Sequence, residues 1–351
     1  MATTAEYLNK LVEQKNTLAD NLVTKGVSAT HDETLETLVP KVLDISGGSS
    51  GGNGIYPVDE YGFPTGDVVI PDGVTSLGQS DYTLFARSNM ITSISCPHTV
   101  TKIASGVCNS LINMTRIIGI DNVIQIGDGA FQNCEKLNIS LPQSITVIEN
   151  SAFRNCSSIT EITIPALTSW GTTTFFQCTS LRTVKFSNDF TFDNIPTHTF
   201  NGCKLLKSIN IPLSVTKINS SAFANSGLES IVIHHNVTWL DASAFSGCTS
   251  LSEISLPNTI AYVNASNNNN NTFSNCTALT TVNLEQDFNC NISFYSSANI
   301  TNAADMLTKL KDLTGETAKT ITFAKAVYDG LTAEEIAVAT NKNWTVASYG
   351  S

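Results

Sequence analysis

One phrase recurs nine times between residues 85 and 276 of this 351-residue chain, and its period constrains the fold more than any other feature. Each copy opens with an apolar anchor, usually phenylalanine, and a small residue follows three positions later. The anchors are Phe85, Val107, Phe131, Phe153, Phe175, Phe200, Phe223, Phe245 and Phe273. Their spacing of 22 to 28 residues is typical of a solenoid, in which each unit buries its apolar face only against its neighbours.

The residues between two anchors predict two short strands. Ile162 and Ile164 flank Thr163, which is the alternation of a half-buried strand, and Pro165 ends that strand because proline has no N–H to donate. A second extended piece follows in most units, as at residues 212–218. The sequence therefore predicts a mainly β solenoid of about nine repeats.

These units resemble the BspA-like leucine-rich repeat family. In one unit, the residues that match the repeat pattern of this family are Ala244, Phe245, Cys248, Leu251, Ile254, Leu256, Pro257 and Ile260. The resemblance covers residues 68–284 and implies a non-enzymatic surface that binds proteins, matrix or cell surfaces. Residues 186–200 and the five asparagines of residues 267–271 depart from the pattern, and Trp170 replaces an inward isoleucine, so we expect it in the core.

Composition argues against several classes of function. The net charge is −11, which disfavours a nucleic-acid partner. No run of 18 apolar residues occurs, so we expect no membrane insertion. Residues 1–10 lack the basic and apolar regions of a signal peptide.

Cysteines and histidines predict neither an enzyme nor a cofactor or metal site. Six cysteines share one register and are expected to stack inside the solenoid as small buried residues: Cys134, Cys156, Cys178, Cys203, Cys248 and Cys276. Cys96, Cys108 and Cys290 lie off this register, and no C-x-x-C pair occurs. The five histidines fall in no metal or nucleophile motif, and we find no phosphate-binding loop.

Residues 1–45 are predicted to form an α-helical or coiled-coil segment. Residues 8, 11, 15, 18 and 22 are spaced by three and four, and all are leucine except Lys15. This spacing predicts a coiled-coil seam formed by Leu8, Leu11, Leu18 and Leu22. These helices cannot bury their apolar faces alone, so they form either a cap for the solenoid or an assembly and docking segment. The Gly/Ser-rich linker of residues 46–54 favours assembly, because it separates the helices from the solenoid predicted over residues 55–290.

Residues 291–351 are predicted to form an α/β unit that caps the solenoid. We expect a helix near residues 302–313 and a strand at residues 320–323. A second helix should open at Thr332, where Glu335 completes a capping box, and Trp344 should close the core.

Both ends of the chain resemble segments of tailed-phage structural proteins. The resemblance rests on residues 7–12, 25–27 and 38–42 at one end, and on residues 331–337 and 339–345 at the other. It implies a non-enzymatic virion protein of the tail-fibre or baseplate type. Such a protein is assembled in the host cytoplasm, contacts other virion proteins through its N-terminal helices and needs no export signal.

Two alternatives remain open. One is a bacterial cell-surface or secreted BspA-like adhesin or protein-interaction module, and the other is a virion head decoration protein. In each case we expect the repeats to bind a surface protein or glycan.

The expected binding surface is the outward column of the second strands. Trp239 and Tyr262 should stand one rung apart with Lys217 before them, and His234 and His235 occupy the preceding turn. Exposed aromatic rings offer apolar faces with polar edges, which suit a sugar ring or a protein hot spot. The alternative is that both rings only cover the edge of the solenoid or pack against residues 267–271.

We predict that the full chain is a homo-oligomer, a trimer rather than a dimer, and that a version starting at Ile55 is a monomer. The truncation removes the predicted leucine seam, which is the assembly element. Light scattering coupled to chromatography gives both masses. If both are monomeric, the helices need another partner or only cap the solenoid.

Overall fold

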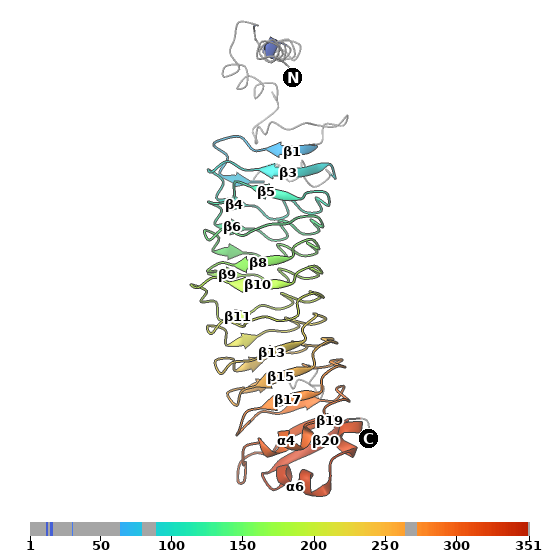
Figure 1. Cartoon of the computed structure of the whole chain (residues 1–351). Helices are drawn as coiled ribbons and strands as arrows, with labels where there is room; N and C mark the ends of the chain where they lie inside the picture. Colours follow the sequence, from blue (N-terminus) through green and yellow to red (C-terminus); the bar gives the residue numbers. More distant parts are fainter. Residues whose placement is uncertain are drawn as a thin grey trace.

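The computed structural model describes residues 12, 15–16, 30, 64–78, 89–263 and 272–349. The coils of residues 64–78, 89–263 and 272–349 stack along one axis into an elongated solenoid (Figure 1). The seam leucines Leu8, Leu11, Leu18 and Leu22 lie outside the described residues, as do Phe85, the linker of residues 46–54 and residues 267–271. The predictions made for those segments therefore stay predictions.

Two parallel ladders of strands run along the solenoid. The first ladder contains β1 (Gly66–Val69), β3 (Ile91–Ser95), β5 (Arg116–Ile118), β8 (Glu161–Ile164), β10 (Thr183–Phe186), β13 (Ser230–Val232), β15 (Glu253–Leu256) and β17 (Thr281–Leu284). The second contains β2 (Ser76–Leu77), β4 (Lys102–Ile103), β6 (Gln125–Ile126), β7 (Val147–Ile148), β9 (Ser169–Trp170), β11 (Asn194–Ile195), β12 (Lys217–Ile218), β14 (Trp239–Leu240) and β16 (Tyr262–Val263). The first ladder falls into three sheets and the second into two. The predicted pair of short strands is thus confirmed in most units, but the units that begin at Phe131 and Phe200 contain only the second-ladder strand, β7 and β12 respectively.

A third side of each coil, which the sequence did not predict as a ladder, is also hydrogen-bonded from coil to coil. Here the Phe131 N–H donates to the Ala152 carbonyl at 2.8 Å, and later coils repeat this bond. Positions two before and two after an anchor adopt the left-handed conformation, as at Ser151 (φ 55°) and Asn155 (φ 60°). This explains why glycine, asparagine and serine recur there, since left-handed backbone is costly for most side chains.

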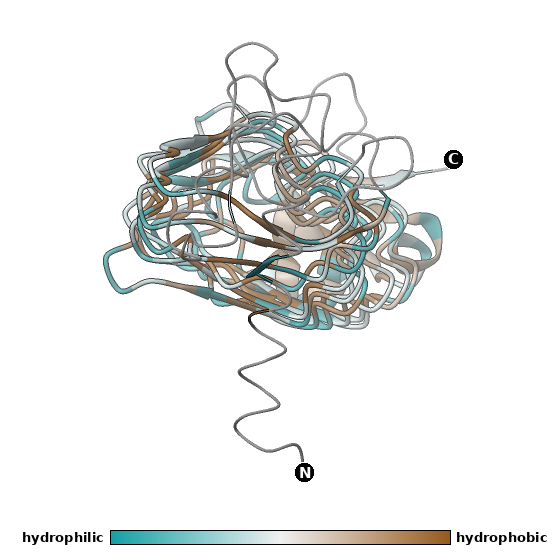
Figure 2. Ribbon diagram, turned by 90° about the horizontal axis from the view of Figure 1, so that it is seen from above, coloured by the Kyte–Doolittle hydropathy of each residue, from teal (hydrophilic) through white to brown (hydrophobic). Residues whose placement is uncertain are grey.

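The anchor phenylalanines form a stack of rings through the core. From Phe131 to Phe294 neighbouring ring centroids lie 5.3 to 5.8 Å apart and the planes differ by at most 21°. This is the offset-stacked distance that aromatic pairs favour. Viewed along the axis, apolar and polar residues alternate around the coils (Figure 2), and the buried side chains are mainly apolar.

One predicted anchor is wrong by one residue. The Cys108 N–H donates to the Ala130 carbonyl, which is the bond that Phe131 makes one coil later. Cys108 therefore occupies the anchor position, and Val107 takes the position that Ala130 occupies in the next coil. The misassignment arose because this unit has no phenylalanine to mark its register.

The solenoid is also longer than predicted, with about 12 turns rather than nine repeats. Phe294 on β18 (Ile292–Phe294) stacks on Phe273 at 5.3 Å and continues the core beyond the last predicted anchor. Residues 64–78 supply a described coil before Phe85.

The irregular stretch of residues 186–200 surrounds Trp170. The indole is buried, as predicted, and the rings that pack edge-on against it are Phe186, Phe190, Phe192 and Phe200. The aromatic residues that break the repeat pattern thus fill the space around one large side chain.

Uncharged polar side chains bond along the outside of the coils. Thr115, Thr168, Thr216 and Ser252 donate to carbonyls one coil earlier, at Thr92, Thr146, Asp193 and Glu229 respectively. This use of hydroxyl groups agrees with a chain in which only 14% of residues are charged.

The C-terminal residues form the predicted α/β cap (Figure 1). β18, β19 (Lys319–Ala324) and β20 (Trp344–Tyr349) make a parallel sheet, and the helices are α4 (Ala303–Thr308), α5 (Lys325–Asp329) and α6 (Ala333–Thr340). The capping box of Thr332 and Glu335 is present, and Trp344 is buried. α4 is shorter than expected and α5 was not predicted. The boundary set at residue 290 stays a prediction.

We predict that Phe175→Ala lowers the free energy of unfolding by about 3 to 5 kcal/mol, the usual cost of removing a buried ring. Phe175 stacks between Phe153 and Phe200, so the cavity opens in the middle of the ring stack. Phe176→Ala is the matched control, because that ring is half-buried and should matter much less. Urea denaturation followed by circular dichroism measures both, and equal losses would contradict the role of the stack.

Candidate functional site

Two aromatic residues stack on each other on the outer face of the second ladder. Trp239 on β14 and Tyr262 on β16 are direct neighbours in register, with ring centroids 3.6 Å apart and planes 17° apart. Lys217 on β12 pairs with Trp239 from the other side. The structure therefore places these three residues on successive rungs of one column, as the sequence predicted. The two rings cover one face of each other, and part of each side chain stays accessible: Trp239 is 37% exposed and Tyr262 is half-buried.

The two histidines of the turn before β14 have different environments. His234 Nε2 lies 2.9 Å from the Pro212 carbonyl, and the Asn236 N–H donates to His234 Nδ1 at 3.2 Å. His234 therefore links two coils, so its nitrogens are already engaged. His235 is exposed, and its Nδ1 lies 3.4 Å from Glu285 Oε2. Of the two predicted histidines, His235 is the one that faces solvent.

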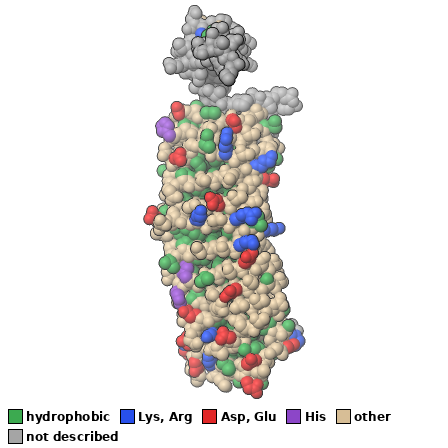
Figure 3. Space-filling model, viewed as in Figure 1, with side chains coloured by type: hydrophobic (Ala, Val, Ile, Leu, Met, Phe, Trp, Pro, Cys, Tyr) green, Lys and Arg blue, Asp and Glu red, His purple; other side chains and the backbone are tan. Residues whose placement is uncertain are grey.

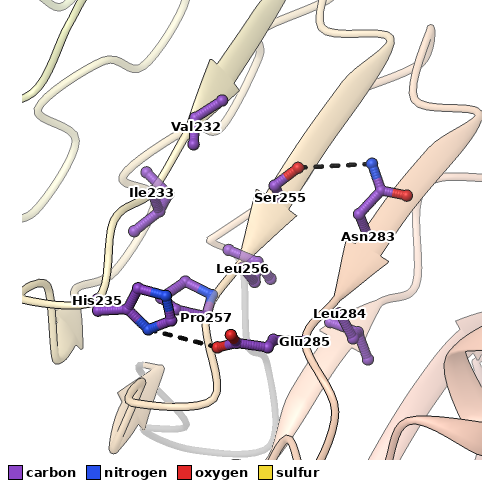
Figure 4. Close-up of a pocket in the computed structure, with 9 residues that line it drawn as sticks. All are labelled: Val232, Ile233, His235, Ser255, Leu256, Pro257, Asn283, Leu284 and Glu285. Carbon is purple, nitrogen blue, oxygen red and sulfur yellow. Dashed lines mark hydrogen bonds and ion pairs between the residues drawn. The ribbon is translucent and has the colours of Figure 1, made fainter.

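A shallow groove of about 290 Å³ lies at the end of the first ladder, beside this turn (Figure 4). It is lined by Val232, Ile233, His235, Ser255, Leu256, Pro257, Asn283, Leu284 and Glu285. Glu285 Oε2 also accepts the Asn258 N–H at 3.0 Å, which fixes the carboxylate at one end of the groove. Sequence reasoning missed the groove and Glu285. The available signal was that Glu285 directly follows a first-ladder strand, where Pro257 stands one coil earlier.

Exposed apolar side chains gather at the same corner of the solenoid. Among the described residues between Ile124 and Val338, the large apolar side chains that are exposed are Leu213 (72%), Val232 (71%) and Trp239 (37%). Leu213 lies in the turn before β12, Val232 ends β13 and Trp239 begins β14. We define the corner patch as Leu213, Val232, His235, Trp239 and Tyr262.

The cysteines are placed for packing rather than chemistry. All nine are unpaired and buried. The six that share a register donate their thiols to the anchor carbonyl of the preceding coil, as Cys156 does to Phe131 at 3.0 Å and Cys178 to Phe153 at 3.2 Å. Burial raises the pKa of the Cys134 and Cys178 thiols to about 12, so they stay protonated near neutral pH. In the described ranges, no three metal-ligating side chains come together.

Charged side chains are scattered over a mostly uncharged surface (Figure 3). Lys185 of β10 pairs with Glu161 of β8 at 3.5 Å, and Lys207 pairs with Glu229 at 2.7 Å. Such exposed pairs contribute little stability. Of the helices that the structure describes, none has the length and apolar character needed to cross a membrane.

Comparisons with known proteins agree with the repeat architecture. Residues 79–193 and 189–301 match the family model described as BspA type leucine rich repeat region, in six copies. Among solved structures, the chain is similar to a leucine-rich repeat protein from Bacteroides ovatus, with 22% identity over 86% of this chain and 90% of that one, and a TM-score of 0.50.

Two further solved structures are similar over long stretches. One is a leucine rich cell surface protein from Faecalibacterium prausnitzii, with 20% identity over 67% of this chain and 94% of that one, and a TM-score of 0.37. The other is the pneumococcal vaccine antigen PcpA, with 13% identity over 87% and 96% of the two chains, and a TM-score of 0.33. No curated protein matches the chain. The resemblance of the two ends to phage structural proteins finds no support in these comparisons.

We predict that the fold loses stability as pH rises from about 9 towards 12. The thiols of Cys134 and Cys178 have an ordinary pKa of 9.0 that burial raises to about 12 in the folded chain. Between these values the unfolded chain releases protons that the folded chain keeps. Stability is therefore complete below pH 9 and falls by about 1.4 kcal/mol per pH unit for each thiol above it.

The loss of stability is measured as a fall in the urea concentration at the midpoint of unfolding, under reducing conditions from pH 8 to pH 11. The control is the Cys134→Ala/Cys178→Ala double variant, which should show a shallower pH dependence because two of the thiols are gone. An unchanged slope would contradict the assignment to the thiols.

Proposed function

The chain belongs to the family of proteins with BspA-type leucine-rich repeats, and we propose that it is a non-enzymatic module that binds a surface partner through those repeats. The observation that carries this proposal is the corner patch. Leu213, Val232 and Trp239 are exposed on neighbouring coils, while the rest of the described surface between Ile124 and Val338 keeps its large apolar side chains covered. Exposed apolar patches with polar surroundings are typical of interaction sites.

Family membership favours one of the sequence-based hypotheses over the others. The matched repeats span residues 79–301, more than half of the chain, and the repeat family implies binding to proteins, matrix and cell surfaces. We therefore favour a bacterial cell-surface or secreted protein-interaction module. The tail-fibre, baseplate and head-decoration hypotheses rest on the two ends of the chain and stay predictions.

The geometry of the corner patch favours a protein partner over a single sugar ring. Trp239 and Tyr262 close one face of each other at a centroid distance of 3.6 Å, which leaves fewer free ring faces for a sugar to stack on. Their edges, together with Leu213 and Val232, offer the mixture of apolar area and polar rim found at protein hot spots. Hydrogen bonds on three sides of each coil hold these residues in place, so little conformational entropy is lost on binding.

We predict that the labelled full chain binds intact bacterial cells or immobilised matrix proteins, and that Trp239→Ala and Leu213→Ser each weaken binding roughly tenfold. Both changes remove exposed apolar area without touching the buried core. Binding isotherms on cells, on matrix proteins and on a glycan array measure the effect. Binding to the glycan array alone would mean that the partner is a sugar and not a protein.

Ile118→Ser is the matched control, because Ile118 is half exposed on a coil far from the corner patch. It should leave binding unchanged. A loss equal to that of Trp239→Ala, or no binding to any of the three surfaces, would overturn the proposal.

A further inference from the structure

We propose that the groove beside the corner patch receives a lysine or arginine side chain of a protein partner, with the cationic group at Glu285. This inference deepens the proposed function and rests on it, since the groove shares Val232 and His235 with the corner patch. It adds the chemistry of the partner, which the corner patch alone leaves undefined.

The groove has an exposed valine at a position where the paired residues on the next two strands are polar. Val232 is 71% exposed and pairs in register with Ser255, which pairs with Asn283 on the next strand. Leu256 and Pro257, which are largely buried, line the groove between Val232 and Glu285 (Figure 4). Lysine and arginine bury their aliphatic stems on such surfaces while the charged head stays in a polar environment.

The carboxylate of Glu285 is held at the end of this groove. His235 and the Asn258 N–H both contact its Oε2, at 3.4 and 3.0 Å. Within the described residues, these contacts leave Oε1 as the atom that can accept a hydrogen bond from a ligand. Figure 4 shows the His235 and Glu285 side chains converging beside Pro257. The carboxylate is thus positioned before any partner arrives.

Glu285 is the one carboxylate among the residues that line the groove, and these residues include no lysine or arginine. Glu161 on β8 and Glu229, which directly precedes β13, each pair with a lysine. Strands β13, β15 and β17, which border the groove, contain no lysine or arginine, and Glu253 Oε1 instead accepts from the Asn283 amide at 2.7 Å. A groove whose lining contains a carboxylate and no lysine or arginine attracts a cationic group.

Two other occupants fit less well. A metal ion needs more ligands than His235 and Glu285 supply, and the described residues bring no third ligand to them. A volume of about 290 Å³ lies at the lower limit for small-molecule pockets, which span roughly 300 to 1,000 Å³. One long side chain from an extended segment fits both the size and the charge.

The test is a titration of the full chain with acetylated and amidated five-residue peptides that differ only at the central residue. That residue is lysine, arginine, norleucine or glutamate, and norleucine keeps the stem of lysine without its charge. The ring-proton NMR signal of His235, assigned by its loss in His235→Ala, reports occupancy. We expect lysine and arginine peptides to bind roughly fivefold more tightly than the norleucine peptide, and the glutamate peptide to bind more weakly still.

Glu285→Gln should abolish the preference for lysine over norleucine, because glutamine keeps an oxygen for the Asn258 N–H but loses the charge. Val232→Thr should weaken the lysine and norleucine peptides alike, since it changes the exposed valine and not the carboxylate. The matched control is Glu161→Gln, an exposed glutamate of the same ladder, and it should leave the preference intact.

Equal binding of lysine and norleucine peptides by the wild-type chain would overturn the inference, as would an unchanged preference in Glu285→Gln. These outcomes are separable from failure of the proposed function. Trp239-dependent binding to cells without a lysine preference removes only the inference. A lysine preference that depends on Glu285, without binding to any surface, removes only the proposed function.

Discussion

Each coil of this solenoid satisfies its backbone hydrogen bonds with the coils before and after it, and this constraint determines the rest of the structure. The bonds run on three sides of the coil, through the two strand ladders and the turn that carries the anchor. Equivalent positions therefore lie about 4.8 Å apart along the axis. At that spacing like charges would repel, whereas rings, hydroxyls and thiols can stack or bond. The phenylalanine stack, the threonine ladders and the cysteine–carbonyl bonds are three results of the same spacing.

Because the register is strict, the sequence predicted much of the fold and part of the site. Periodic anchors located the core, and counting from them placed Lys217, Trp239 and Tyr262 on one column. The same method misplaced the anchor at Val107, because that unit has no phenylalanine to mark its register. Its register is marked instead by left-handed backbone at Gly106 and Ser110, which only the structure shows.

The groove could not have been predicted in this way. His235 and Glu285 are 50 residues apart in the sequence, and the carboxylate lies beyond the intervening coil of Pro257. No repeat pattern encodes such a contact, because it joins residues at different positions of two coils that are not adjacent. The stacking of Trp239 on Tyr262 could not be predicted either, because the repeat register defines the positions of the two residues but not the orientation of their rings.

Because the surface is repetitive, a partner could bind at several positions along the solenoid axis. Apolar contacts alone could form on several coils, since neighbouring coils present similar shapes at intervals of about 4.8 Å. The contact between Glu285 and His235 across the intervening coil makes this part of the solenoid different from the others. Val232 and Glu285 stand two rungs apart, which an extended partner segment spans with about three residues. In this arrangement the exposed apolar residues supply most of the affinity, and the charge at Glu285 selects the position along the solenoid, as electrostatic complementarity does at protein interfaces.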